Sequence, residues 1–411
     1  MDSLTQLVLG AACGEAVLGK KVGNRALLWG AIGGTIPDLD VFANFVTDEI
    51  TALAFHRSIT HSLFFAFLAP LLLGWGVQRL YSSGLYRKQS YKIGMSVFWL
   101  LFLIALINGV PAAMGNPFNL KLFGWSFGIV LFLGVLFWRF YWRGTSSEVN
   151  ASTKGWVLLF FFSIVTHPLL DCCTAYGTQL FRPFLDYRVA WNNISVVDPI
   201  YTTPFLISLL VLLFLRRTSN LRQVFNWAAI GLSSAYMMLT FYNKVRVNNI
   251  FKESLAAKGI QYERYMTSPT ILNNILWNGL AEGDSSYFYA MYSFYDPQKE
   301  FLDIQEVPKE HDKLAGHFED RDIAILTWFT NDYYTLMEDS SGKLMLFDLR
   351  YGSMSGHMDS PSDFVFRFDL ETDAPEWKAA QNSDGPPIDN VAFRKFWDRV
   401  FARTGPWEAP N

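Results

Sequence analysis

Six residues in the first half of the chain have the types and spacing of metal ligands. They are Asp38 and Asp40 in a Pro-Asp-Leu-Asp sequence, His56 and His61 in His-Arg-Ser-Ile-Thr-His, and His167 and Asp171 in His-Pro-Leu-Leu-Asp. Imidazole and carboxylate groups from separate helices build the metal sites of helical bundles. The residues therefore predict a site for a divalent transition metal. Such mixed ligation suits Zn²⁺ best, and Mn²⁺ or Fe²⁺ would also fit.

The spacing within two of the motifs indicates how their side chains could converge. Asp38 and Asp40 follow Pro37, which stops a helix, and in an extended chain they would point the same way. His167 and Asp171 are four residues apart, so they would share one face of a helix.

The remaining motif is less regular, because His56 and His61 are five residues apart and a single helix holds that spacing poorly. We expect His56 to lie just before the turn that carries His61. The expected primary ligands are His56, His61, His167 and Asp171, with Asp38 and Asp40 as further ligands or as partners that fix imidazole tautomers.

Each of these residues has an alternative interpretation as a structural, hydrogen-bonded group. Three of the six histidines of the chain fall in this half, however, and all three belong to the motifs. Ionisable groups at membrane depth are costly and usually functional. Taken together, the motifs favour a metal site.

Other polar residues near the motifs could take part in catalysis. A bound divalent ion would lower the pKa of its water toward about 7 and polarise a phosphoryl or acyl oxygen, with Asp40 or Asp198 as general base. Guanidinium groups could grip a phosphate, and the candidates are Arg57, Arg182 and Arg188. Salt bridges of these arginines to Asp186 or Asp198 are the structural alternative. Tyr176 and Trp191, in the same stretch as Asp186, are expected to shape the pocket.

Long apolar segments must position these residues. About 20 residues cross a hydrocarbon core of about 30 Å, and six clear segments occur at 63–80, 93–110, 122–138, 156–170, 203–215 and 224–242. Two weaker, Gly- and Ala-rich segments at 4–19 and 26–36 are expected to pack inside the bundle. The sequence thus predicts a polytopic all-α membrane bundle of six to eight helices over residues 1–242.

Composition separates the two halves of the chain and excludes several classes of protein. Hydrophobic residues make up 51% of the chain, aromatic residues 17% and charged residues 17%. Up to Tyr242 there are 17 Lys and Arg against 10 Asp and Glu, and beyond it 17 against 27. The aromatic content and the three cysteines exclude a disordered chain and a disulfide scaffold.

The basic residues of the first half predict its orientation, because Lys and Arg concentrate in cytoplasmic loops. If the segments alternate, one side receives thirteen, namely Lys20, Lys21, Arg25, Arg79, Arg87, Lys88, Lys92, Arg139, Arg143, Lys154, Arg216, Arg217 and Arg222. The other side receives Arg57, Lys121, Arg182 and Arg188. This bias places the metal-ligand motifs and the second half outside the cytoplasm.

Residues 243–411 alternate in the manner of strands at 286–293, 333–337 and 343–348, with a turn at 339–342. We expect a small extracytoplasmic α+β domain with an antiparallel sheet. It offers no cysteine and no paired histidines, so we expect it to cap the membrane site. Its acidic character gives no support to nucleic-acid binding.

The motifs resemble those of the YdjM-like family of bacterial inner-membrane metal-dependent hydrolases. The resemblance rests on the three ligand motifs in this order, on Met-Asp-Ser-Leu-Thr at the start, and on Ser-Val-Val-Asp-Pro-Ile-Tyr-Thr at 195–202. It covers at least residues 1 to 217. That family is thought to share its metal-site logic with zinc-dependent phospholipase C and related nucleases, which implies hydrolysis of a phosphoester.

One position departs from the family pattern. Many members carry Thr-His near the N-terminus, where this chain has Thr5-Gln6. An amide is a weak donor or acceptor and a poor metal ligand compared with imidazole. If that histidine binds metal elsewhere in the family, the site of this chain has lost a ligand or has changed its role.

The leading hypothesis is a multi-pass inner-membrane metallohydrolase that acts on a membrane lipid or a lipid-linked phosphoester. A transporter or metal-handling protein could use the same residues as a permeation or proton path. Such a path needs ionisable groups toward the cytoplasm, and Glu15 is nearly alone there. A non-catalytic envelope factor with a structural metal is a third possibility. The oligomeric state is not assigned.

Overall fold

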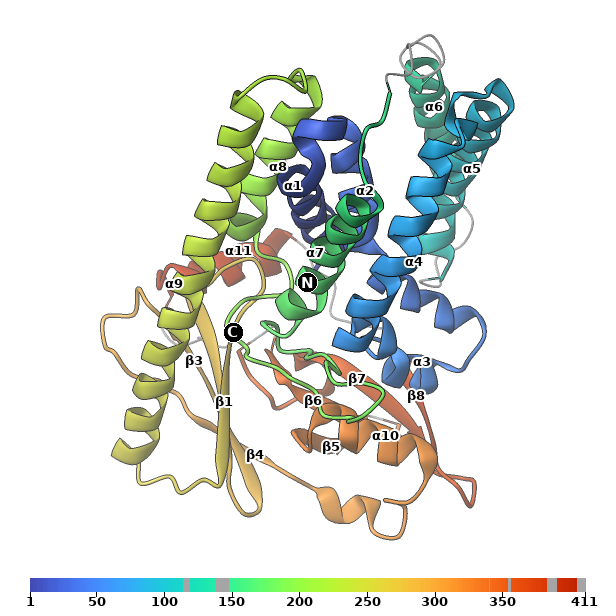
Figure 1. Cartoon of the computed structure of the whole chain (residues 1–411). Coiled ribbons are helices and arrows are strands. Elements are labelled where there is room, and N and C mark those ends of the chain that lie inside the picture. The colour runs from blue at the N-terminus through green and yellow to red at the C-terminus, as the bar shows by residue number, and fades with distance from the viewer. Residues whose placement is uncertain (114–118, 138–147, 340, 354–355, 383–389, 405–411) are drawn as a thin grey trace. The chain divides into compact units, whose positions relative to one another are not determined.

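A computed structural model describes residues 1–113, 119–137, 148–339, 341–353, 356–382 and 390–404. The chain forms two compact units. The first comprises Met1–Pro70 and Leu158–Asn411, and the second comprises Leu71–Val157. The first half is helical, with α1 (Ser3–Val22), α2 (Asn24–Thr35), α4 (Leu63–Ser82), α5 (Gln89–Ala113), α6 (Leu120–Phe137), α7 (Thr153–Asp171), α8 (Pro199–Phe214) and α9 (Leu221–Ala257) (Figure 1).

Each predicted apolar segment coincides with one of these helices. The last position of segment 122–138 and the predicted cytoplasmic residues Arg139 and Arg143 lie outside the described residues. Three helices, α4, α7 and α9, are long and apolar enough to cross a membrane. Shorter apolar stretches lie in α5, α6 and α8. The number of membrane crossings therefore stays a prediction.

Small residues allow α1 and α2 to pack closely. A Cβ atom added at Gly10 would collide with the carbonyl oxygen of Gly30, and one at Gly14 with that of Ala26. The turn between the helices uses Gly23 at φ +63°, a conformation that favours glycine. Helix α1 also packs against α8 and α9, so the prediction that segment 4–19 lies inside the bundle is confirmed.

Three short elements after α2 carry the first two motifs. They are the 3₁₀ helix η1 (Pro37–Phe45), helix α3 (Glu49–Phe55) and the single turn η2 (Ile59–His61). Asp48 caps α3 by accepting a hydrogen bond from the backbone N–H of Thr51 at 2.9 Å. His56 is the C-terminal cap of α3 and His61 ends η2, as the spacing of the motif predicts.

The second unit consists of the end of α4, the turn η3 (Leu85–Arg87), α5, α6 and the start of α7. Asn108 of α5 donates a hydrogen bond to the Ser126 hydroxyl of α6 at 3.1 Å. The rings of Tyr81 and Trp156 stack with their centroids 5.4 Å apart.

The second half contains two four-stranded antiparallel sheets, where the sequence predicts one. The first has the order β1 (Arg264–Pro269), β2 (Leu276–Glu282), β3 (Ser286–Ser293) and β4 (Gln305–Pro308), and the second β5 (Tyr334–Glu338), β6 (Leu344–Ser353), β7 (Phe364–Glu371) and β8 (Lys378–Asn382). The helical elements are η5 (His311–Leu314), α10 (Arg321–Thr330), η6 (Pro361–Asp363) and α11 (Asn390–Val400). The strands predicted at 286–293, 333–337 and 343–348 correspond to β3, β5 and β6. Helix α9 runs through position 242, so the proposed domain boundary falls inside a helix.

The core of the second half extends into the first. Tyr287 and Tyr289 of the first sheet pack with Phe347 and Phe364 of the second. A further core, formed by α10 and the second sheet, includes Ile50 of α3 and Tyr176 of the segment between α7 and α8. Helix α3, which is capped by His56, and the segment that follows α7 are thus packed against the C-terminal domain.

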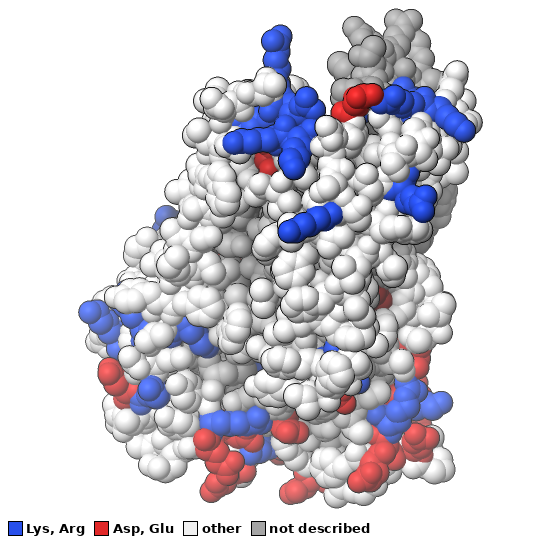
Figure 2. Space-filling view, viewed as in Figure 1, with Lys and Arg blue, Asp and Glu red and all other residues white. Residues whose placement is uncertain are grey.

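Basic side chains gather at one end of the helices of the first unit, whereas basic and acidic side chains are mixed over the C-terminal domain (Figure 2). Exposed basic residues lie where α1 meets α2 and where α8 meets α9, namely Lys20, Lys21, Arg216 and Arg217. The other end of α1 carries Ser3, which contacts Asp38, and its 20 residues span about 30 Å. The basic end and the ligand motifs are therefore about the thickness of one bilayer core apart.

Candidate metal centre

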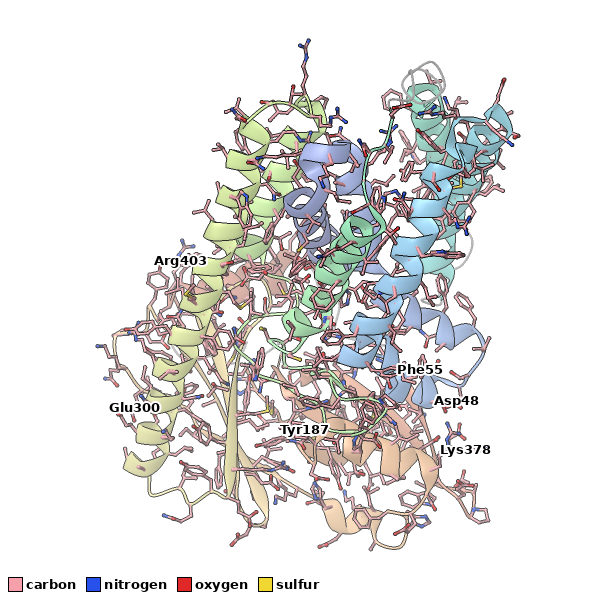
Figure 3. The ribbon with its side chains drawn as sticks, in the orientation of Figure 1. Asp48, Phe55, Tyr187, Glu300, Lys378 and Arg403 are labelled. Carbon is pink, nitrogen blue, oxygen red and sulfur yellow. The ribbon has the colours of Figure 1, made fainter. Side chains whose placement is uncertain are left out.

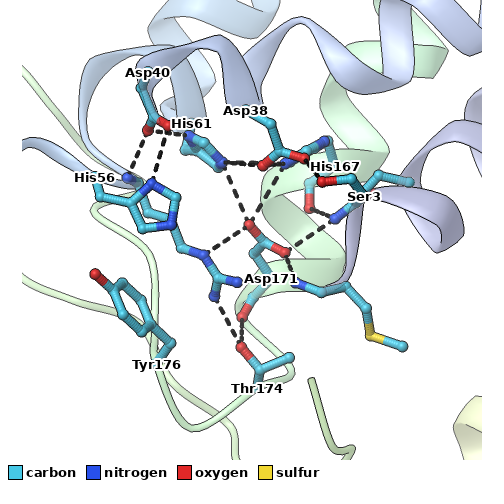
Figure 4. A network of polar contacts seen from close by, with 12 residues as sticks. Ser3, Asp38, Asp40, His56, His61, His167, Asp171, Thr174 and Tyr176 are labelled. Carbon is cyan, nitrogen blue, oxygen red and sulfur yellow. Dashed lines mark hydrogen bonds and ion pairs between the residues drawn. The ribbon is translucent and has the colours of Figure 1, made fainter. Parts of the chain in front are cut away.

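The three motifs converge on one polar cluster (Figure 4). Ligand atoms of Asp38, His61 and His167 all lie within 4.8 Å of one another. The Nε2 atoms of the two histidines are 3.1 Å apart, and Asp38 Oδ1 is 3.3 Å from that of His167 and 3.7 Å from that of His61. Residues from η1, η2 and α7 thus form a compact group of imidazole and carboxylate ligands.

Asp171 joins this cluster from the last turn of α7. Its Oδ2 lies 3.4 Å from His61 Nε2 and 3.6 Å from His167 Nε2. The prediction that His167 and Asp171 share a helix face is therefore confirmed. Oδ2 is buried and has no hydrogen-bond partner; Arg57 Nε lies 3.2 Å away, but the pair lacks hydrogen-bond geometry. This oxygen is free to act as a further ligand.

The other carboxylate oxygen of Asp171 is already occupied. Oδ1 accepts a hydrogen bond from Gln6 Nε2 at 3.0 Å and also contacts the α-ammonium group of Met1. Gln6 therefore lies beside the cluster, and it contributes an N–H donor to a carboxylate.

The two imidazole rings are held with Nε2 toward the centre. His167 Nδ1 contacts the Gly34 carbonyl oxygen at 2.6 Å, and His61 Nδ1 lies 3.2 Å from Asp40 Oδ2. Carbonyl and carboxylate oxygens only accept hydrogen bonds, so the contact with Gly34 requires a proton on His167 Nδ1. Asp40 favours the same tautomer for His61, whose Nδ1 also lies 3.2 Å from the Thr60 hydroxyl. A neutral ring in this tautomer presents its Nε2 lone pair to the centre of the cluster, as a metal ligand must.

The prediction that Asp38 and Asp40 lie in an extended chain is wrong. Pro37 occupies the first turn of η1, where its fixed φ and missing N–H favour a helical start. In this 3₁₀ helix the two carboxylates diverge. Asp38 faces His61 and His167, whereas Asp40 contacts His56 and His61.

Asp40 connects the cluster to His56. It accepts hydrogen bonds from His56 Nδ1 at 3.0 Å and from the backbone N–H of Arg57 at 2.8 Å. His56 is outside the group formed by Asp38, His61 and His167, and its side chain is 35% exposed. Burial alone would raise the pKa of Asp40, but the hydrogen bonds from the imidazoles outweigh it and hold the pKa well below its usual value. Asp40 is therefore an ionised partner that orients both rings.

The pKa of Asp38 is also lowered. Burial opposes ionisation, but hydrogen bonds to His167 and His61 favour the charged form and dominate. The cluster thus brings together two imidazole lone pairs and two carboxylates. Arg57 and the Met1 ammonium group offset the charge of Asp171, but the two Nε2 atoms and Asp38 repel one another unless a positive charge lies among them. A proton on an imidazole or a divalent cation would supply that charge, so the donor set fits a metal ion.

The comparisons with known proteins concern the half of the chain that carries this cluster. The sequence model of the family described as "YdjM inner membrane protein" matches residues 1–113 and 121–247. The chain belongs to the YdjM inner membrane protein family. No curated protein and no solved structure matches this YdjM family member significantly. The family places the protein in the membrane, in accord with its apolar helices.

The predicted substrate-binding arginines of this YdjM protein have different surroundings. Arg182 forms an ion pair with Asp186 at 2.8 Å, which is the structural alternative. Arg57 has φ +58°, and its Nη1 donates to the Thr174 hydroxyl at 3.0 Å. Arg188 has no ion-pair partner among the described residues, since no carboxylate of the resolved parts comes within 4.0 Å of it.

Asp198, the other predicted general base, is held by residues of α8 and α9. Its carboxylate caps α8 through the backbone N–H groups of Ile200 and Tyr201, and it accepts a hydrogen bond from the Tyr236 hydroxyl at 2.9 Å. Burial raises its pKa despite these bonds. The contacts are those of a helix cap.

Three contributors to the cluster were not among the candidates from the sequence: the Met1 ammonium group, the Ser3 hydroxyl and the Gly34 carbonyl. The Ser3 hydroxyl donates to Asp38 Oδ2 at 3.1 Å, and the Gly34 carbonyl fixes the His167 ring. A backbone carbonyl has no signature in a sequence. Ser3 could have been noticed only through its place in the N-terminal motif of the family. Tyr176, expected to shape the pocket, packs edge-on against His56 with centroids 5.3 Å apart.

Proposed function

We propose that this protein is an integral membrane hydrolase that uses a divalent transition metal, preferably zinc, to cleave a phosphoester at the extracytoplasmic membrane surface. The observation that carries the proposal is the convergence of two Nε2 lone pairs and two carboxylates, with both Nδ1 atoms already bonded. Asp38, His61 and His167 would hold the ion, with Asp171 Oδ2 as a further ligand. A divalent ion supplies Lewis acidity, which activates water and polarises a phosphoryl oxygen.

A pair formed by His56 and Asp40 would handle the proton. The His56 ring is partly exposed, and its Nδ1 donates to Asp40, so its Nε2 can accept a proton from the attacking water. The buried Asp40 carboxylate stabilises the imidazolium that results. In this arrangement Asp40 acts through His56, and Asp198 remains the cap of α8.

Apolar side chains beside the cluster support a lipid-linked substrate. Segment η1, which carries Asp38, also exposes Phe45 by 73%, and the next residue, Val46, is exposed by 82%. On the segment between α7 and α8, Phe184 is 77% exposed and contacts Phe64 at the start of α4. Such groups at the end of a membrane helix suit insertion among acyl chains. Figure 3 marks Phe55 of α3 and Tyr187 of the α7–α8 segment, two further exposed rings.

The transport alternative depends on Glu15, which is not free to carry protons. Arg222 binds it through two hydrogen bonds, of 2.9 and 2.6 Å, and also donates to the backbone oxygens of Leu212 and Leu215. The ion pair therefore joins α1 to the turn between α8 and α9. This favours hydrolysis over a proton path.

The test is hydrolysis by the full-length protein in detergent. Long-chain phosphomonoester and phosphodiester lipids and their water-soluble counterparts would be assayed with Zn²⁺, Mn²⁺ and Fe²⁺ after chelation. We expect metal-restored turnover that favours the lipids and is lost in His167→Ala. His311→Ala is the matched control, since His311 stacks on Tyr334 in the C-terminal domain. Absence of metal-dependent turnover on every substrate would reject the proposal.

A further inference from the structure

An arginine with two buried nitrogens and no counter-ion among the described residues lies beside the proposed metal centre. Arg188 Nη2 donates a hydrogen bond to the Tyr176 carbonyl oxygen at 2.9 Å. Its Nε and Nη1 are buried and have no hydrogen-bond partner. Within the described part of the chain, no carboxylate oxygen is close enough to pair with it. Buried, unpaired guanidinium N–H groups are costly, so they require an explanation.

The surroundings of Arg188 are aromatic. Its guanidinium carbon lies 4.7 Å from the ring centre of Tyr176, 5.1 Å from that of Phe329 and 5.3 Å from that of Trp328. Ring faces attract a cation but do not replace strong hydrogen-bond acceptors. They hold the guanidinium in place and leave its remaining N–H groups available.

Two other guanidinium groups share these rings, and both are paired with acids. Arg57 lies 4.7 Å from the Tyr176 ring and 3.2 Å from Asp171. Arg350 lies 4.8 Å from the Phe329 ring and 2.6 Å from Asp348. Of these three guanidinium groups, Arg188 is the one that forms no ion pair with an acid among the described residues.

The position of Arg188 is fixed by the backbone around it. Thr178 and Val189 exchange backbone hydrogen bonds of 3.0 and 2.9 Å, which closes the segment into a short hairpin. Gly177 allows this at φ +75°, where a Cβ atom would lie 3.2 Å from that of Ala190. Arg188, Arg57 and His56 all contact the Tyr176 ring. The free cation is therefore preorganised one ring away from the metal cluster.

We infer that Arg188 is the centre of a subsite for a phosphate-type oxyanion and that the C-terminal domain completes it through Trp328 and Phe329. The inference rests on the proposed function: it assigns to the substrate an anionic oxygen beyond the ester that the metal centre would cleave. A guanidinium fork pairs Nη2 with either Nε or Nη1. Since Nη2 donates one of its two N–H groups to the Tyr176 carbonyl oxygen, its other N–H group can join Nε or Nη1 in binding two oxygens of one phosphate. The occupant is either the headgroup of a lipid or free phosphate, and both present the same oxygens.

The experiment measures anion binding separately from turnover. Full-length protein, stripped of metal by chelation, would be titrated with inorganic phosphate by calorimetry, and its thermal midpoint would be followed with and without phosphate. We expect binding and a rise of the midpoint for the wild type. Arg188→Met should weaken binding by about tenfold for each hydrogen bond lost. Arg188→Lys retains the charge without the fork and should be intermediate.

Arg182→Met is the matched control, because Arg182 lies in the same segment but already pairs with Asp186 and Gln179. It should bind phosphate as the wild type does. Equal binding by Arg188→Met, or no binding by the wild type at millimolar phosphate, would overturn the subsite. Competition with nanodiscs that contain or lack phosphatidic acid would identify the occupant. If only the nanodiscs with the acidic lipid displace phosphate, the occupant is a lipid headgroup. If neither displaces it, the occupant is free phosphate.

The subsite and the hydrolase can fail separately. Phosphate binding that depends on Arg188, without hydrolysis of any phosphoester, would reject the hydrolase and retain the subsite. Metal-dependent hydrolysis with an unchanged KM in Arg188→Met would reject the subsite and retain the hydrolase.

Discussion

Substituting Asp40 tests whether the metal centre depends on a carboxylate that is not itself a ligand. In the structure this side chain accepts hydrogen bonds from His56 Nδ1 and from the backbone N–H of Arg57, and its Oδ2 lies 3.2 Å from His61 Nδ1. Only the His61 interaction orients a ring of the ligand group. Loss of such a partner typically weakens metal binding about 10- to 100-fold, which corresponds to about 1.4 to 2.7 kcal/mol.

We therefore expect Asp40→Ala to lie near the upper end of this range and Asp40→Asn near the lower end, because asparagine keeps one acceptor oxygen. Competition with a chromogenic chelator would measure the affinity for Zn²⁺. Asp186→Asn, which removes an exposed acid paired with Arg182, is the control and should have no effect. If Asp40→Ala bound Zn²⁺ within twofold of the wild type while remaining folded, the orienting role would be refuted.

Three further predictions concern packing, pH and orientation. Gly14→Ala should lower the free energy of unfolding by about 1 to 3 kcal/mol, because its Cβ would collide with the carbonyl of Ala26. Gly231 has open space around it, so Gly231→Ala should leave the free energy of unfolding unchanged. Equal denaturation curves for the two variants would contradict the close packing of α1 and α2. The backbone N–H of Thr51, its hydroxyl and Arg321 lower the pKa of Asp48, so the folded state loses stability as pH falls below the unfolded value of about 3.9. Asp48→Asn should flatten that part of the curve of thermal midpoint against pH, and an unchanged slope would show that the contacts do not hold in solution. Reporter fusions after positions 85, 148 and 219 should report the cytoplasm and those after 50, 185 and 300 the outside; a cytoplasmic signal at 300 would reject the orientation.

The helices and the pairing of His167 with Asp171 could be predicted because both depend on local periodicity. The turn between His56 and His61 could also be predicted, from a spacing that one helix cannot hold. The conformation of Asp38 and Asp40 was predicted wrongly, since the proline that stops α2 also starts η1. A local pattern does not decide between these two roles of proline.

Other features depend on contacts between distant segments, which a single sequence does not encode visibly. The Gly34 carbonyl fixes the His167 ring across 133 positions of the chain. Ile50 and Tyr176 belong to a core formed mainly by residues beyond 310. The second sheet was missed in part because β7 and β8 lie beyond the strands that alternation made evident.

Helix α9 has a consequence for how the two halves of the protein can vary. Its 37 residues, without a break, extend about 55 Å, nearly twice the thickness of a hydrocarbon core. Its last turns present Val247, Phe251 and Leu255 to the first sheet. Each residue added to an α-helix turns everything beyond it by about 100° and advances it by about 1.5 Å. One continuous helix thus joins the domain to the membrane part and fixes the rotation between them. Single-residue insertions in this helix would rotate the sheets away from α3. Insertions of seven residues would nearly restore the rotation and would mainly lengthen the helix.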